Sequence, residues 1–195
     1  MPRYLSDEEV MKMNEALAKG RKYTVEEIEA MPEDVFVELI DGVLYYQATP
    51  TLTHQALLSF LHIEIGSYIR ENKGTCKVYE GPLALYLNQD SETYLIPDLM
   101  IVCDKSKSEE RGIVSGPDVV MEVVSPSSRT RDYILKLNKY QEAGVREYLI
   151  LDPKEEKIIV YQFENEMIKI YGFQDRIPAA ALDGLEIDFS GCELA

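Results

Sequence analysis

The chain has 195 residues, of which 46% are hydrophobic and 28% are charged, a composition typical of one folded domain rather than of a disordered segment. No apolar run approaches the roughly 20 residues of a membrane-spanning helix, and residues 1–20 lack the apolar centre of a secretion signal, so we expect a cytoplasmic protein without membrane contacts. The net charge of −15 disfavours an extended phosphate-binding surface, because nucleic-acid-binding proteins usually carry a basic face.

The charge is distributed unevenly along the chain. Residues 1–41 hold eleven acidic side chains against five basic ones, whereas residues 127–147 hold five basic side chains against three acidic ones. The basic side chains of this second stretch are Arg129, Arg131, Lys136, Lys139 and Arg146. We therefore expect a local basic face that meets a phosphate backbone weakly and with strong salt dependence.

The three cysteines, Cys76, Cys103 and Cys192, are far apart in the sequence and form no CxxC pair. This spacing predicts neither a structural zinc site nor a disulfide framework. We expect three reduced thiols.

Two helices are predicted at the N-terminus. Ser6 and Thr24 each precede a glutamate by three residues, which is the spacing of a capping box. The first helix, about residues 7–18, belongs to a peripheral arm spanning residues 1–20, and the second ends near Met31.

A hairpin and a longer helix follow. Residues 36–46 contain two β-prone runs joined by Asp41-Gly42, a dipeptide that accepts the positive φ angles of a tight turn. Residues 53–71 carry hydrophobic side chains at helical spacing, and Lys73-Gly74 ends that helix.

Strand-like segments dominate the rest of the chain. They cover residues 77–87 (one or two strands around Gly81-Pro82), 94–102, 118–124 and 146–151, with a terminal hairpin over residues 157–173. A helix over residues 131–143 begins after a capping Ser128 or Thr130 and ends at Gly144. The order from residue 53 is helix, three strands, helix, strand, which predicts an α/β (α+β) domain with a mixed sheet flanked by helices over residues 21–195.

Glu122 is the most informative residue. It is the one charged side chain in the run Val119–Val124, and such a run suits a strand covered on both faces. A carboxylate buried there is costly unless it is paired or binds a cation. The alternatives are an exposed strand face or a structural pair with an arginine.

Asp98 repeats this pattern, since it follows Pro97 and precedes another apolar run. Alone it is equally consistent with a turn or capping aspartate. Two neighbouring apolar strands with one acid each would bring both carboxylates to one point, and oxygen ligands of this kind suit Mg²⁺. His54 stands near a helix start, where a partly packed histidine is more common than a catalytic one.

Several of these segments resemble one known family. The segments around Tyr23, Glu38, Asp98 and Glu122, together with residues 140–153, are similar to the Uma-two putative restriction endonuclease family, formerly a domain of unknown function. The resemblance runs from about residue 21 to the C-terminus. It implies the restriction-endonuclease-like PD-(D/E)xK fold, whose core order is αβββαβ.

The resemblance also implies roles for individual residues. Asp98 and Glu122 match the metal-binding carboxylates of the motif, and Glu38 matches an acid that often joins the site. The usual motif has a lysine two residues after the glutamate, where this chain has Val124. The resemblance implies that Lys136 replaces it from the following helix, where it shares a face with Asp132 and Tyr140; a surface ion pair with Asp132 is the competing interpretation.

The function implied is Mg²⁺- or Mn²⁺-dependent hydrolysis of DNA phosphodiester bonds, with a homodimer as a plausible assembly. Two alternatives stay open. The net charge and Val124 favour a catalytically decayed module that binds nucleic acid or protein, and an enzyme acting on a small phosphorylated metabolite would use the same metal site.

Overall fold

The computed structural model describes residues 20–31, 35–87, 90–179 and 181–192. The helix expected over residues 7–18 lies outside these residues. Within them, no helix is both long enough and apolar enough to cross a bilayer.

The first described elements match the expected helix and hairpin. Helix α2 (Val25–Glu29) begins with a complete capping box between Thr24 and Glu27. Strands β1 (Val37–Ile40) and β2 (Val43–Tyr46) pair antiparallel. Asp41 and Gly42 both have positive φ angles in the turn between them, as that dipeptide predicts.

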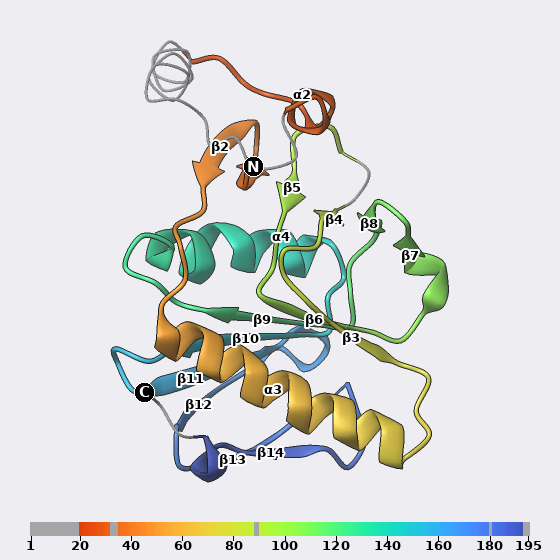
Figure 1. Cartoon of the computed structure of the whole chain (residues 1–195), viewed down its shortest axis with the longest axis vertical. Helices are drawn as coiled ribbons and strands as arrows, with labels where there is room; N and C mark the ends of the chain where they lie inside the picture. Colours follow the sequence, from red (N-terminus) through yellow and green to blue (C-terminus); the bar gives the residue numbers. More distant parts are fainter. Residues whose placement is uncertain (1–19, 32–34, 88–89, 180, 193–195) are drawn as a thin grey trace.

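The long helix α3 (Leu52–Glu71) carries the predicted apolar face, with four buried side chains: Leu57, Leu58, Leu61 and Ile65. The helix runs across one face of the largest sheet (Figure 1), beside the small sheet formed by β13 (Arg176–Pro178) and β14 (Glu186–Asp188). These elements and one face of the largest sheet share a single apolar core.

The described residues form two six-stranded sheets, and the one called the largest sheet, because its strands contain more residues, has the order β12-β11-β10-β9-β6-β3. Their bounds are β3 (Lys77–Glu80), β6 (Leu99–Val102), β9 (Val119–Val123), β10 (Glu147–Asp152), β11 (Lys157–Gln162) and β12 (Met167–Gly172). Strands β9 and β10 run parallel and the other pairs antiparallel, so the predicted mixed sheet is confirmed. All five residues of β9 are buried, as expected for a strand covered on both faces.

The second sheet has the order β2-β1-β5-β4-β8-β7. Besides the hairpin it contains β4 (Leu85–Tyr86), β5 (Tyr94–Leu95), β7 (Ser108–Glu109) and β8 (Gly112–Ile113). Side chains from this sheet and from α4 (Lys136–Glu142) form a second core on the opposite face of the large sheet. The site described below lies where the two sheets meet.

One predicted strand is wrong. Residues 94–102 form two strands, because β5 belongs to the second sheet and β6 to the largest one. The chain changes sheet at Ile96-Pro97-Asp98, where proline cannot donate to a ladder. Leu95 of β5 and all of β6 are buried, so the apolar residues on both sides of Pro97-Asp98 resemble one strand.

The helix after β9 also differs from its prediction. Its first part, Arg131–Leu135, is a π-helical turn that continues directly into α4. Thr130 makes no capping hydrogen bond, whereas Gly144 ends the helix with a positive φ angle as predicted. The terminal hairpin of β11 and β12 is present, with its turn at Phe163–Asn165.

The expectation of three reduced thiols is wrong. Cys76 and Cys103 form a disulfide, and Cys192 is the free cysteine of the described residues. The register of β3 and β6 pairs Lys77 with Val102, so the two cysteines stand opposite each other at the end of that ladder. Twenty-seven residues separate them in sequence, and only the strand pairing brings them together.

Candidate active site

A cluster of buried ionisable side chains occupies the seam between the two sheets. Glu38 comes from β1 in the second sheet, Glu122 from β9 in the largest sheet, and Lys136 from the start of α4. All three side chains are almost fully buried. Elements from three parts of the chain therefore converge at one point.

Lys136 joins the two glutamates. Its Nζ donates a hydrogen bond to Oε1 of Glu122 at 2.7 Å and forms an ion pair with Oε1 of Glu38 at 2.8 Å. The backbone N–H of Ile96 also donates to that Glu38 oxygen at 3.1 Å. This hydrogen bond connects the cluster to the segment at which the chain passes from one sheet to the other.

Glu122 is held by a second donor from the same helix. The hydroxyl of Tyr140 donates to Oε1 of Glu122 at 2.7 Å. Burial raises the pKa of Glu122 well above its usual range, and the nearby Lys136 ammonium opposes that rise only in part. Burial and the Glu122 carboxylate also raise the pKa of Tyr140, so its hydroxyl stays protonated and keeps donating.

Asp98 lies immediately before β6. Extending the register of β6 and β9 by one residue places Asp98 opposite Glu122, and residues directly opposite in an antiparallel pair project from the same face. Oδ2 of Asp98 accepts a hydrogen bond from Val123 N at 2.7 Å and lies 3.1 Å from Nε2 of His54. The Val123 N–H and the His54 ring therefore both approach Oδ2 of Asp98.

Asp132 and Arg131 complete the cluster. Oδ1 of Asp132 lies 3.7 Å from Lys136 Nζ, and Arg131 Nε lies 3.8 Å from Oε2 of Glu38. Neither carboxylate oxygen has a hydrogen-bond partner, although both are buried. Burial raises the pKa of Asp132, against the effect of Lys136.

Carboxylates outnumber cations in this cluster. Four acids, Glu38, Asp98, Glu122 and Asp132, face the two permanent cations Lys136 and Arg131. Burial by itself lowers the pKa of Lys136, but the surrounding carboxylates outweigh that effect and raise it well above its usual value. The pKa values of Glu122, Asp132 and Lys136 are all raised for a common reason. A buried group of side chains with surplus negative charge is stabilised by bound protons or by another cation.

The cluster fits a hard divalent cation in charge and donor type. All four acids offer carboxylate oxygens, the ligand type that Mg²⁺ and Mn²⁺ prefer, and two of these oxygens, Glu38 Oε2 and Asp132 Oδ1, are buried without a hydrogen-bond partner. Across the described ranges, no group of three or more His, Cys, Asp or Glu side chains is arranged to hold a metal alone. An ion bound here would take one or two carboxylates and complete its shell with water and phosphate oxygens.

The predicted site residues differ in how they lie. Glu38, Glu122 and Lys136 are in contact, and Asp98 is adjacent through the strand register. Lys136 is buried, so it does not form the surface pair with Asp132 that was the competing interpretation. Lys139 instead pairs with Asp41 at the hairpin turn.

The expected basic face is not present as an open surface. Each of its five cations lies within ion-pair distance of an acid: Arg129 with Asp152, Arg131 with Glu38, Lys136 with Glu122, Lys139 with Asp41 and Arg146 with Glu164. Any nucleic acid would therefore have to compete with acidic partners for these side chains.

Four members of the site, Arg131, Asp132, Tyr140 and His54, were not assigned from the sequence. Arg131 was counted only as part of the basic stretch, and its guanidinium stacks over the Tyr45 ring at 5.3 Å beside Glu38. His54 was expected to be a packed histidine, yet it lies against Asp98. The predicted helix over residues 53–71 placed it at a helix start, and the structure adds a capping Thr51, but no sequence pattern links His54 to Asp98.

The proteins similar to this chain include a solved structure and a cyanobacterial sequence. A solved structure of a putative nuclease belonging to DUF820 from Anabaena variabilis superimposes with a TM-score of 0.71, covering 86% of this chain and 95% of that one at 19% identity. The restriction-endonuclease-like fold is thereby confirmed. An uncharacterized protein of Synechocystis, slr1290, is 22% identical over 144 residues, which cover 72% of this chain and 74% of that protein.

The family assignment rests on a wider match. The sequence model of the Uma2 family, described as putative restriction endonuclease, matches residues 25–190. This range includes both sheets and every residue of the buried cluster. The chain belongs to the Uma2 family of putative restriction endonucleases.

Proposed function

We propose that this chain is a divalent-metal-dependent endonuclease that hydrolyses DNA phosphodiester bonds. The observation that carries the proposal is the position of Lys136, whose ammonium lies 2.7 Å from Glu122 and 2.8 Å from Glu38 within a buried set of surplus carboxylates. The family motif requires a lysine beside its metal-binding carboxylates. Here the helix supplies the lysine that is missing at Val124.

Asp98 and Glu122 are the proposed metal ligands, and Glu38 completes the shell directly or through water. Bound Mg²⁺ or Mn²⁺ would polarise the phosphate and lower the pKa of the attacking water. Val123 N and His54 both approach Oδ2 of Asp98, which leaves Oδ1 as the oxygen for a ligand. The Tyr140 hydroxyl fixes the orientation of Glu122 in the same way.

Lys136 would supply positive charge to the phosphate. The surrounding carboxylates raise its pKa and keep the ammonium charged at neutral pH, so its role is to donate hydrogen bonds and stabilise charge rather than to act as a base. The same ammonium separates Glu38 from Glu122 and limits their repulsion.

A homodimer is part of the proposal, because cleavage of both strands requires two sites. Strand β12 is an edge of the largest sheet, and its side chains Ile168 and Ile170 are 63% and 68% exposed. Such an edge supports pairing with a second copy. Sedimentation of wild type and an Ile168→Lys variant tests this assembly, which is lost in the variant if β12 is the interface.

The function is tested by incubating supercoiled plasmid with purified protein and Mn²⁺ at low ionic strength. We expect nicking or cleavage by the wild type and none by Glu122→Gln, which keeps the shape of the side chain but removes its charge. Glu147→Gln is the matched control, because Glu147 is an equally buried glutamate in the adjacent strand β10 outside the cluster. It should cleave as the wild type does.

Equal background from the wild type and Glu122→Gln would reject the nuclease proposal. Metal-induced thermal stabilisation without cleavage of any nucleic acid would instead favour the enzyme acting on a phosphorylated metabolite. If the protein shows neither metal-induced stabilisation nor cleavage, the remaining alternative is the catalytically decayed binding module.

A further inference from the structure

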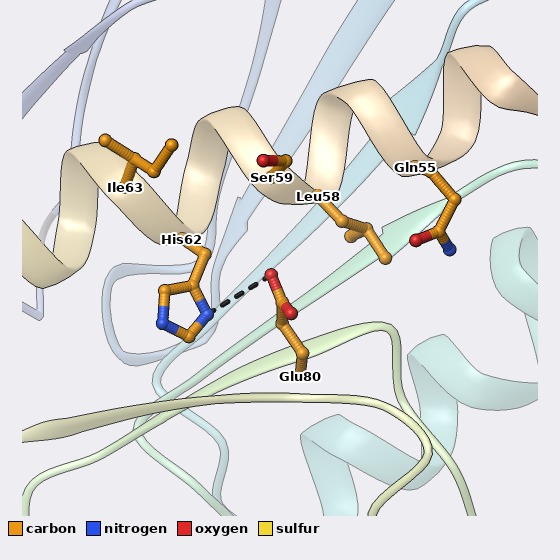
Figure 2. Close-up of a pocket in the computed structure, with 6 residues that line it drawn as sticks. All are labelled: Gln55, Leu58, Ser59, His62, Ile63 and Glu80. Carbon is orange, nitrogen blue, oxygen red and sulfur yellow. Dashed lines mark ion pairs between the residues drawn. The ribbon is translucent and has the colours of Figure 1, made fainter.

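A pocket of about 360 Å³ lies between α3 and the end of β3. Figure 2 shows that His62 on the helix and Glu80 on the strand face each other across it, with His62 Nδ1 3.2 Å from Glu80 Oε1. The lining residues are Gln55, Leu58, Ser59, His62, Ile63 and Glu80. None of them belongs to the carboxylate cluster.

Both walls of the pocket are adjacent to residues that contact Asp98. On the helix side, Gln55 directly follows His54, which lies 3.1 Å from Asp98. On the strand side, Glu80 directly precedes Gly81, whose N–H donates to the Asp98 carbonyl at 2.9 Å. The pocket therefore lies next to the proposed catalytic centre along both elements.

The pocket begins about one helical turn beyond the residue that contacts Asp98. Leu58 lies four residues beyond His54, which is about 6 Å along a helix, a separation on the scale of neighbouring nucleotides. A strand whose phosphate sits at Asp98 would therefore bring a nearby base, one or two nucleotides away, to this pocket.

The lining excludes a phosphate and fits a base. Neither lysine nor arginine lines the pocket, and the Glu80 carboxylate repels anions. Leu58 and Ile63 provide apolar contact for a flat ring, while the Gln55 amide and the Ser59 hydroxyl donate and accept hydrogen bonds. A nucleobase combines an apolar face with such an edge.

We propose that this pocket binds an unpaired nucleobase that carries an exocyclic amino group, next to the phosphate that is cleaved. Glu80 accepts the hydrogen bond of that amino group, as acidic side chains do from cytosine N4. A base inside a duplex cannot enter a side pocket, so the nucleotide is single-stranded or flipped out. This inference rests on the proposed nuclease function, because it assumes that a strand passes Asp98.

Binding without catalysis tests the inference. Fluorescence anisotropy in EDTA compares oligodeoxycytidylate with oligothymidylate of about ten nucleotides, within the usual site size of single-strand binding, at slightly alkaline pH. We expect the wild type to bind the cytidylate strand roughly tenfold more tightly, the discrimination typical of one good base contact. Glu80→Gln should reduce this preference to about twofold or less, since an amide also donates to thymine O4.

A filled pocket provides the matched comparison. Ser59→Trp places a large ring in the pocket and should abolish the preference, whereas Glu64→Trp places the same ring at an exposed position of α3 outside the pocket and should retain it. Thermal unfolding confirms that each variant is folded. Three outcomes would each overturn the proposal. The wild type could show no preference, Ser59→Trp could show the same preference as the wild type, or free deoxycytidine could bind as tightly as the oligonucleotide.

Failure of the nuclease function is distinguishable from failure of this site. A base preference in EDTA that depends on Glu80, without Glu122-dependent plasmid cleavage, supports the base site and rejects the nuclease. Cleavage that depends on Glu122, with binding unaffected by Ser59→Trp, supports the nuclease and rejects the base site.

Discussion

The ammonium of Lys136 lies 2.7 Å from Oε1 of Glu122, although 14 residues separate them in the chain. This contact joins the strand β9 to the helix α4. The usual motif would place a lysine on the strand itself, where this chain has Val124, and the proposed function gives that role to Lys136. Three predictions follow from this contact and from the groups around it, and a fourth follows from the disulfide.

Lys136→Met should destabilise the protein and abolish cleavage. Removing one partner of a buried ion pair leaves uncompensated charge and costs about 3–5 kcal/mol. Lys139→Met is the control, because Lys139 pairs with the exposed Asp41 and a pair of that kind contributes at most about 1 kcal/mol. Urea unfolding and plasmid cleavage measure both effects, and equal activity of Lys136→Met and wild type would falsify the role of Lys136.

The stability of the metal-free protein should fall as the pH rises through the weakly acidic range. Burial raises the pKa of Glu122 above its ordinary value of 4.5, so the folded state keeps a proton that the unfolded state releases above that pH. The stabilisation is present below pH 4.5 and is lost as the pH rises toward the folded-state pKa, by about 1.4 kcal/mol per pH unit for one proton.

Glu122→Gln removes this titration. As the pH rises above 4.5, its free energy of unfolding should therefore decline less steeply than that of wild type. Burial also raises the pKa of Asp132. The free energy of unfolding of the variant should therefore still decline with pH, but with a smaller slope. Identical slopes for the two proteins in urea titrations would show that Glu122 is ionised throughout.

His54 should control metal binding by orienting Asp98. His54→Gln keeps a nitrogen donor near Oδ2 of Asp98, whereas His54→Leu removes it, and both retain the backbone hydrogen bond to Thr51. Mn²⁺ at about 100 times its dissociation constant stabilises a folded protein by about 2.7 kcal/mol. We expect this gain to persist in His54→Gln, to shrink in His54→Leu and to vanish in Asp98→Ala, as read from thermal shifts; an unchanged gain in His54→Leu would assign His54 to packing alone.

The disulfide should contribute measurably to stability. A bridge across 27 residues of sequence restricts the unfolded chain by about 3.5 kcal/mol. Cys103→Ser should therefore lose about that much in urea unfolding, and Cys192→Ser, which removes the free thiol, should change stability by about 0.5 kcal/mol or less. Alkylation of all three cysteines in unreduced, unfolded protein would exclude the bridge.

The sequence predicted the large elements because each carries a long periodic or apolar run. It did not reveal the change of sheet at Pro97, since the apolar residues on both sides of Pro97-Asp98 resemble one strand. Strands β7, β8, β13 and β14 have two or three residues each, too few for any period to be seen.

The cluster was predictable only in part. An acid within an apolar strand signals that Glu122 needs a partner, because an unpaired buried carboxylate is costly. The partner itself follows from how the helix packs on the sheet, and Lys136 was assigned through the family resemblance. The pairing of His54 with Asp98 depends on where α3 crosses the sheet, which no local pattern encodes. The metal-binding and catalytic roles of these residues stay predictions.

The π-helical turn at Arg131–Leu135 has a consequence for how this protein tolerates change. A π-turn accommodates one more residue than an α-helical turn, so a single-residue deletion there would let a regular helix form while the residues on either side keep their relative orientation. A single-residue deletion within α4, between Lys136 and Tyr140, has no extra residue to absorb it and would rotate everything after it by about 100°. Tyr140 would then swing off Glu122 while Lys136 stayed in place, so the loss of three nucleotides from the gene would have opposite outcomes at positions a few residues apart.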